Sequence, residues 1–309
     1  MKKTGMLILI ALLLLAGCGP KTDPAPAGPT AAPTGQPTAA VPPFALSEGF
    51  FAKVDGSTAN IPLAEAVTGF FLQKSPAECE EYIRFSGTSM AYERLISRAA
   101  DLLIVYEPAE LTKEVIDDSA VAIQAKPIGR DALVFLIHKD NGVDNLTADQ
   151  IRDIYAGKID NWKQVGGADQ AIKAFQRNAT AGSQAMMDKL VMKGRPMMTP
   201  PQDWVIGDMG GLLTAVAVYD GQAMSLGYNV YYYVTEMMAN PDIKILQVDG
   251  IMPGHETIAK GQYPFVNDFF AVIRQDEPKD SEAYRLFTWL QGAEGQKLIF
   301  DSGYVTAGE

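Results

Sequence analysis

Three short segments of the sequence combine glycine and hydroxyl residues immediately before a helical pattern. They are Gly56-Ser57-Thr58, Ser86–Ser89 and Thr180–Ser183. The first turn of a helix has backbone N–H groups without partners and a partial positive charge, and glycine lets a ligand approach the main chain. Hydroxyls add donors without net charge. Serine and threonine are also ordinary N-caps, so one such segment would mean little. Three in one chain, with Arg177 just upstream of the last, predict a converging anion site.

The sequence gives no support for catalysis. The sequence has two histidines, His138 and His255, and we expect both to be polar surface residues. It contains no phosphate-binding P-loop, no His-Glu-x-x-His and no Gly-x-Ser-x-Gly. We therefore expect a binding protein without enzymatic activity, cofactor or metal.

Composition excludes further classes of protein. The 309 residues are 47% hydrophobic, enough for a sizeable core, and 26 basic residues stand against 37 acidic ones for a net charge of −11. An acidic chain without a basic block is unsuited to nucleic acid. Two cysteines and two histidines exclude a disulfide scaffold and a zinc cluster.

The first 45 residues predict export and attachment to a membrane. Two lysines and an apolar run lead to Leu15-Ala16-Gly17-Cys18, which resembles the lipobox of bacterial lipoproteins. That resemblance implies a signal peptide at 1–17 and lipid chains on Cys18. Residues 18–45 are rich in Pro, Ala and Thr, and such a segment cannot bury enough surface to fold. We expect it to tether a globular body to the membrane.

The rest of the chain alternates strand-like and helix-like runs, which predicts an α/β fold. Two continuous apolar runs, 102–105 and 133–137, are typical of buried strands. Thr147 and Gln150 form a capping box, and Gly157 is placed to end the helix that follows. Helices are also expected around 62–71, 92–99, 186–191 and 286–290, and a strand over 269–273. Asp208–Gly211 is assigned to a loop lining the cleft, and Tyr231–Tyr233 to a strand that divides its rings between core and cleft wall.

Several segments resemble the phosphate-binding proteins that feed bacterial ABC transporters. The similarity runs from about residue 50 to 306 and is most specific between Tyr155 and Gly167. Its other parts are Gly56–Thr58, Leu146-Thr147, Arg177–Gln184, Leu226–Tyr228, Tyr263-Pro264, Glu294–Gln296 and Gly303–Val305.

This resemblance implies a type II periplasmic-binding-protein fold, with two α/β lobes joined by two crossing strands and a ligand in the cleft between them. Lobe 1 would hold 46–133 and 264–309, and lobe 2 would hold 134–263. The implied ligand-binding residues are Ser57, Thr58, Ala59, Thr88, Glu107, Arg177, Thr180, Ala181, Gly182 and Ser183. The lobes would close on the ligand and dock on an ABC permease.

Two departures from the family pattern bear on the ligand. Ala181 replaces a serine of the family loop. The family aspartate that accepts the proton of hydrogen phosphate aligns with Tyr106, and the adjacent Glu107 is the replacement acceptor that we expect. If Glu107 instead faces solvent, the site would be less selective or would hold another ligand.

The sequence thus predicts a lipid-anchored, extracytoplasmic, monomeric protein that captures inorganic phosphate for an ABC import permease. Two alternatives stay open. One is a binding lipoprotein for another small oxyanion, such as sulfate or a molybdate-like ion. The other is a sensor or accessory lipoprotein that is not coupled to transport, since a sensor and a transport receptor need the same clamp.

Overall fold

The computed structural model describes residues 41–218 and 223–307. Cys18, the predicted signal peptide and most of the predicted tether lie outside these residues. The chain from Pro42 onward forms one compact unit. Its packing begins at Phe44, whose ring lies 4.9 Å from that of Phe71 and 5.5 Å from the guanidinium carbon of Arg285.

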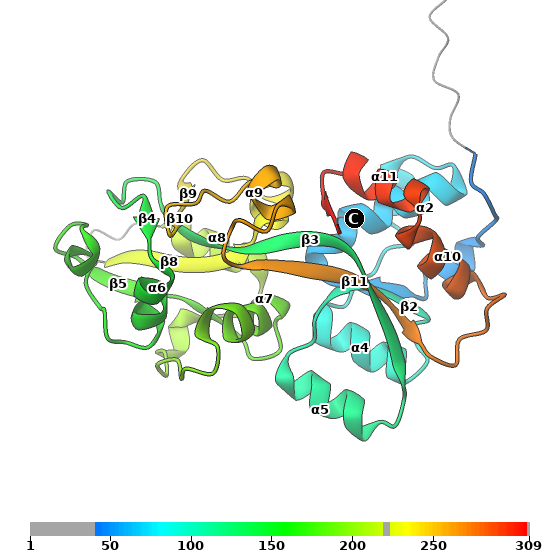
Figure 1. Cartoon of the computed structure of the whole chain (residues 1–309), viewed down its shortest axis with the longest axis horizontal. Helices are drawn as coiled ribbons and strands as arrows, with labels where there is room; N and C mark the ends of the chain where they lie inside the picture. The colour runs from blue at the N-terminus through cyan, green and yellow to red at the C-terminus, as the bar shows by residue number, and fades with distance from the viewer. Residues whose placement is uncertain (1–40, 219–222, 308–309) are drawn as a thin grey trace, which may run out of the picture. The chain divides into compact units, whose positions relative to one another are not determined.

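A mixed sheet in the strand order β1-β2-β11-β3-β8-β5 forms the centre of this unit, and β9 and β12 also pair with β3 (Figure 1). The strands of this sheet are β1 (Val54–Gly56), β2 (Leu102–Tyr106), β3 (Ile123–His138), β5 (Ala171–Ala174), β8 (Ala223–Val230), β9 (Ile243–Ile245), β11 (Val266–Arg274) and β12 (Val305–Thr306). Two small parallel pairs complete the strands: β4 (Asn145–Leu146) with β10 (Gln247–Val248), and β6 (Gln176–Arg177) with β7 (Val205–Ile206).

The long strand β3 belongs to both halves of the sheet. Up to Ala132 it pairs with β11, and from Leu133 it pairs with β8. The half built on β1, β2, β11 and β12 is called the first lobe here, and the half built on β5, β8 and β9 the second. β3 and β11 run antiparallel, side by side, between the lobes (Figure 1). The predicted architecture of two lobes joined by two strands is confirmed.

Helices flank both halves of the sheet. Those of the first lobe are α1 (Glu48–Phe51), η1 (Thr58–Asn60), α2 (Ile61–Leu72), α3 (Pro76–Cys79), α4 (Thr88–Ile96), α5 (Glu110–Asp118), α10 (Glu282–Gln291) and α11 (Ala293–Asp301). The others are α6 (Ala148–Tyr155), η2 (Trp162–Val165), α7 (Gly182–Met186), η3 (Met187–Met192), η4 (Gln202–Trp204), α8 (Met209–Ala217), η5 (Tyr233–Met237) and α9 (His255–Ala259).

Most of the elements predicted from sequence are present. The two apolar runs lie in β2 and β3, where every residue of 102–106 and 131–138 is buried except for small contacts with solvent. The predicted capping box is confirmed, because Thr147 and Gln150 exchange hydrogen bonds of 3.1 and 2.8 Å at the start of α6. Gly157, with φ of 75°, follows the end of that helix in the left-handed region.

Three local predictions are wrong. Tyr231–Tyr233 follow β8 in a helical turn that leads into η5, so the three rings do not alternate across a strand. Asp208 is not in an open loop but is the N-cap of α8, where its carboxylate accepts the N–H of Gly211 at 2.6 Å. His138, expected at the surface, is 8% exposed.

Candidate functional site

A small cavity lies where the three predicted segments meet. It measures about 90 Å³, about three times the ~30 Å³ that one water occupies in the liquid, and well below the ~300–1,000 Å³ of pockets for drug-sized ligands. Its size suits one small polyatomic ion. The residues that line it are Ser57, Thr58, Ala59, Gly87, Thr88, Tyr106, Arg177, Ala181, Gly182, Ser183, Met209 and Val230.

Eight of the ten predicted site residues therefore lie together. Ser57–Ala59 enter η1 at the end of β1, and Thr88 begins α4, so both belong to the first lobe. Ala181–Ser183 lie at the start of α7 in the second lobe. First-turn N–H groups have no partner within their own helix, so several of them open toward the cavity from both sides.

The lobes touch at the rim of this cavity. The Ser89 hydroxyl of α4 donates to the Thr180 carbonyl at 2.8 Å and accepts from Thr112 of α5 at 2.7 Å. Gly182 packs so closely on Thr88 that a Cβ at position 182 would lie 2.6 Å from the Thr88 hydroxyl oxygen. The structure thus has the cleft closed, and the glycine is required by this close approach.

Arg177 is the only cation among the residues that line the cavity, and it is 7% exposed. Its guanidinium donates to the carbonyls of Ile206 and Gly207, both at 3.0 Å, and to the Ser183 hydroxyl at 3.3 Å. No carboxylate pairs with it among the described residues. Burial lowers the pKa of the guanidinium from its ordinary value. A guanidinium has five N–H donors, so two remain for a ligand in the cavity.

The main chain of Arg177 is fixed from behind by a buried tyrosine of β8. The Arg177 N–H donates to the Tyr228 hydroxyl oxygen at 3.0 Å, and that hydroxyl donates to the Gln184 side chain. Tyr228 is fully buried, and its ring lies 5.5 Å from that of Tyr155. Because two aromatic rings of the core hold the backbone, the guanidinium enters the cavity from a rigid support.

The cavity hydroxyls are oriented by their partners. The Ser57 oxygen accepts the N–H of Tyr106 at 3.2 Å and shares a 2.8 Å hydrogen bond with Thr88. The Ser183 oxygen accepts from Arg177, so its own proton is available to a ligand. Thr180 does not line the small cavity; it lines the adjoining recess of about 610 Å³, together with Asp208 and Tyr233.

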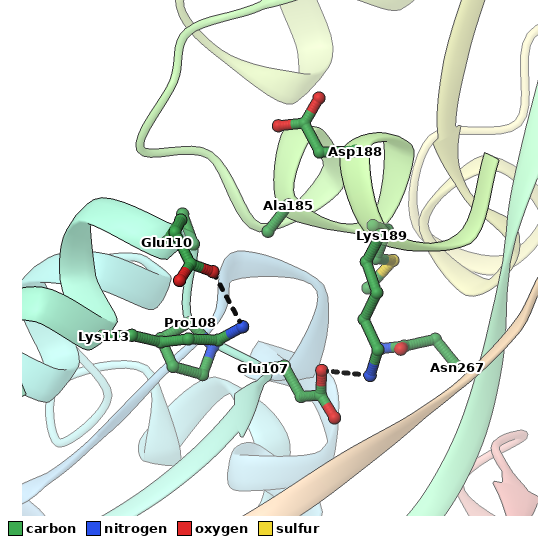
Figure 2. Close-up of a pocket in the computed structure, with 10 residues that line it drawn as sticks. Glu107, Pro108, Glu110, Lys113, Ala185, Asp188, Lys189 and Asn267 are labelled. Atoms are coloured by element: carbon green, nitrogen blue, oxygen red, sulfur yellow. Dashed lines mark hydrogen bonds and ion pairs between the residues drawn. The ribbon is translucent and has the colours of Figure 1, made fainter. Parts of the chain in front are cut away.

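Glu107 is not at this site, contrary to the prediction. It follows the last residue of β2, and successive side chains of a strand point to opposite sides. Its carboxylate forms an ion pair across the cleft with Lys189 of η3, and both line a separate pocket with Asn267 (Figure 2). The position beside the cavity belongs instead to Tyr106.

Tyr106 leads to a buried carboxylate that the sequence reasoning missed. The Tyr106 hydroxyl donates to Asp131 at 2.7 Å, and Asp131 is 2% exposed on β3. Burial raises the pKa of Asp131 to about 6, although its hydrogen bonds with Tyr106 and with the N–H groups of Ala132 and Tyr232 favour the ionised form. Met209 and Val230 were also missed, because apolar residues give no signal of a site.

Metal-binding clusters and membrane-spanning helices are absent from the part of the chain that the structure describes. In residues 41–218 and 223–307 there is no group of three or more His, Cys, Asp or Glu that could hold a metal ion. The cavity lining holds the hydroxyls of serines and threonines, one tyrosine and one cation. Within the same residues, none of the helices combines the length and apolar character needed to cross a membrane.

Fold and site together define a two-lobed solute-binding protein with an anion cavity in its cleft. Residues 26–293 match the family described as the PBP superfamily domain, and the chain belongs to this family of solute-binding proteins, which are not enzymes. It is 28% identical over 255 residues to the phosphate-binding protein PstS of Bacillus subtilis, covering 82% of this chain and 79% of the relative. It is 24% identical over 262 residues to PstS of Staphylococcus haemolyticus, covering 84% and 81%.

Solved structures show the same fold. A candidate phosphate ABC transporter substrate-binding protein from Clostridium perfringens, with bound phosphate, superposes with a TM-score of 0.63 at 22% identity, covering 82% of this chain and 98% of that one. An ABC-type phosphate transport receptor from Vibrio cholerae gives a TM-score of 0.60 at 24% identity, with the same coverage.

Proposed function

We propose that this protein captures inorganic phosphate outside the cytoplasm for an ABC import permease, without chemical change. One observation carries the proposal: the buried guanidinium of Arg177 has no carboxylate partner among the described residues and faces a cavity of about 90 Å³ edged with hydroxyls and free N–H groups. A buried charge needs a counter-charge. An oxyanion in the cavity would supply it.

The ligand contacts follow from this placement. Two N–H groups of Arg177, the hydroxyls of Thr58 and Ser183, and the N–H groups at the starts of η1 and α7 would surround the anion. Such donors from both lobes favour the closed cleft only when the anion is present, which gives ligand-dependent closure. The names of the relatives, phosphate-binding proteins, support phosphate over other oxyanions.

Isothermal titration calorimetry of the purified protein with phosphate, sulfate and molybdate tests the ligand. We expect binding of phosphate with at least tenfold preference over the other two. No heat with any of the three anions would refute the oxyanion site. Preference for sulfate or molybdate would keep the site and replace the ligand, in favour of the alternative that the sequence left open.

We propose lobe boundaries at 46–133 with 264–309 for lobe 1 and 134–263 for lobe 2. The exchange of partners along β3 between Ala132 and Leu133 supports the first boundary. The hydrogen bond from the Leu133 N–H to the Phe265 carbonyl, 3.0 Å long, supports the second. Limited proteolysis with and without phosphate should protect both crossing strands at all times, and cleavage there in the folded protein would contradict the boundaries.

We further propose that a signal peptide at 1–17 is removed, that lipid on Cys18 anchors the protein, and that it acts as a monomer. The Leu-Ala-Gly-Cys motif supports the signal peptide and the lipid anchor. Cys18→Ser should abolish palmitate labelling, whereas labelling that persists in that variant would contradict lipid on Cys18. Loss of phosphate uptake on deletion of the gene would support transport; normal uptake with altered phosphate signalling would favour the sensor.

A further inference from the structure

The direction of the hydrogen bond between Tyr106 and Asp131 determines what Tyr106 can offer to a ligand in the cavity. The Tyr106 hydroxyl donates its one proton to Asp131 at 2.7 Å. A tyrosine oxygen that has donated its proton can still accept, because its lone pairs remain. At the opposite wall, the Ser183 hydroxyl accepts from Arg177 and is left to donate. Tyr106 lines the cavity, and its oxygen, unlike the Ser183 hydroxyl, has only lone pairs to offer a ligand.

The hydrogen bond from the Tyr106 hydroxyl to Asp131 is costly to break. It is 2% exposed, its Oδ1 accepts the N–H groups of Ala132 at 2.7 Å and Tyr232 at 3.2 Å, and its Oδ2 accepts from Tyr106. The titratable groups that face it are all tyrosines: Tyr106 of β2, Tyr231 and Tyr232 after β8, and Tyr304 before β12. If Tyr106 turned its proton to a ligand, a buried carboxylate would lose its partner.

We propose that Tyr106 and Asp131 form a relay that selects protonated oxyanions, the Tyr106 oxygen accepting the proton of hydrogen phosphate while Asp131 holds the tyrosine proton. This inference rests on the proposed phosphate function and adds its specificity-determining residues, with Asp131 acting as a positioning residue. Fully ionised sulfate has no proton to give, so its oxygen would face the lone pairs of Tyr106. The relay thus discriminates against sulfate by repulsion between oxygen lone pairs.

Glu107 does not compete for this role, because its carboxylate is paired with Lys189 in the separate pocket (Figure 2). Arg177 cannot accept a proton. Ser57 already accepts the Tyr106 N–H, and its remaining hydrogen bond is shared with Thr88. Among the side-chain oxygens that line the described cavity, that of Tyr106 is the one whose proton is held by a carboxylate, so it can only accept from a ligand.

Asp131→Asn reverses the direction of the hydrogen bond between residue 131 and Tyr106 and keeps the size of the side chain. The asparagine oxygen can still accept the two backbone N–H groups, and its amide can then donate to the Tyr106 oxygen. The tyrosine proton must then turn toward the cavity. We expect phosphate affinity to fall and sulfate affinity to rise, so that the phosphate-to-sulfate affinity ratio drops by roughly 10- to 100-fold. Tyr106→Phe should lower phosphate affinity roughly tenfold without reversing the preference.

Calorimetry with phosphate and sulfate on wild type and both variants tests the relay. Tyr263→Phe is the matched control, because Tyr263 is also buried, its hydroxyl donates to the Leu133 carbonyl at 3.2 Å, and it is not among the groups that face Asp131, so its ratio should stay unchanged. A wild type that binds neither anion would refute the phosphate function itself. A wild type that binds both equally, or an unchanged ratio in a folded Asp131→Asn protein, would overturn the relay and leave the phosphate site standing.

A pH titration needs no variant. Sulfate carries no proton between about pH 5 and 8, so its affinity reports the protein alone. As the pH falls below about 6, Asp131 takes up a proton and can donate to Tyr106, as asparagine would. Wild-type sulfate affinity should therefore rise several-fold on acidification, and that of Asp131→Asn should stay flat. A flat wild-type profile, or the same rise in the variant, would overturn the relay.

Discussion

Replacing Arg177 by methionine isolates the charge at the centre of the site. Methionine keeps much of the volume and removes all five donors. In the complex, the anion would lose two N–H partners and the cation that neutralises it in a closed cavity. Truncating one member of a buried charge pair costs about 2–5 kcal/mol, so phosphate affinity should fall by roughly 30- to 5,000-fold.

The loss should appear in binding and not in folding. Burial lowers the pKa of Arg177, which means that its charged form is unfavourable in the empty cavity, so its removal recovers part of that cost. Against this, the carbonyls of Ile206 and Gly207 lose a donor. We expect thermal stability without ligand to change by less than about 2 kcal/mol.

Arg152→Met is the matched control. Arg152 is also largely buried in the second lobe, where it donates to the Val191 carbonyl at 2.7 Å and pairs with Asp149, away from the cavity. Calorimetry of the three proteins with phosphate, and melting curves with and without phosphate, give the comparison. If Arg177→Met bound phosphate within twofold of wild type, or if Arg152→Met lost as much affinity, Arg177 would not be the counter-charge of the ligand.

Three further predictions concern closure, selectivity and stability. Gly182→Ala puts a methyl group 2.6 Å from the Thr88 oxygen and should weaken phosphate binding about tenfold or more by preventing closure, whereas Gly142→Ala, with open space around it, should have no effect. Glu107→Gln should change the free energies of binding phosphate and sulfate equally and by less than about 1 kcal/mol, because its ion pair is partly exposed. Asp131→Asn should gain up to ~3 kcal/mol of unfolding free energy relative to wild type between about pH 4 and 7, measured by urea unfolding of the ligand-free proteins.

The sign of the last prediction follows from linkage. Burial raises the pKa of Asp131 to about 6, so in this window the folded state binds more protons than the unfolded state and wild-type stability falls as the pH rises. An opposite slope would show that the carboxylate is stabilised when ionised. Unaltered affinity in Gly182→Ala would show that closure tolerates a methyl group. A selective loss of phosphate in Glu107→Gln would return the proton acceptor to Glu107.

The fold could be predicted from local signals wherever a residue has one dominant role. The capping box at Thr147 works through hydrogen bonds within four residues, and the apolar runs of β2 and β3 reflect burial on both faces. The first half of β3 gave no such signal. Residues 125–127 are exposed there and include a proline; they pair with β11 on one side, and the pairing with β12 is confined to Gly129 and Arg130.

The site was predictable as far as it depends on residue type. Hydroxyls, glycines and Arg177 predict an anion site, and eight of the ten predicted residues line one cavity. Whether Tyr106 or Glu107 reaches the cavity depends on the direction of each side chain at the end of β2, which the composition does not show. Asp131 was missed because it acts through Tyr106 from a strand distant in sequence.

The place of β11 affects how the chain can fold. This strand, near the C-terminus, lies between β2 and β3, which begin about 160 and 140 residues earlier in the chain. Until it arrives, two neighbouring strands have unpaired inner edges, so the first lobe cannot assemble as the chain emerges. A first lobe that can assemble only after its last strand has been made would keep the chain unfolded for the export that we propose.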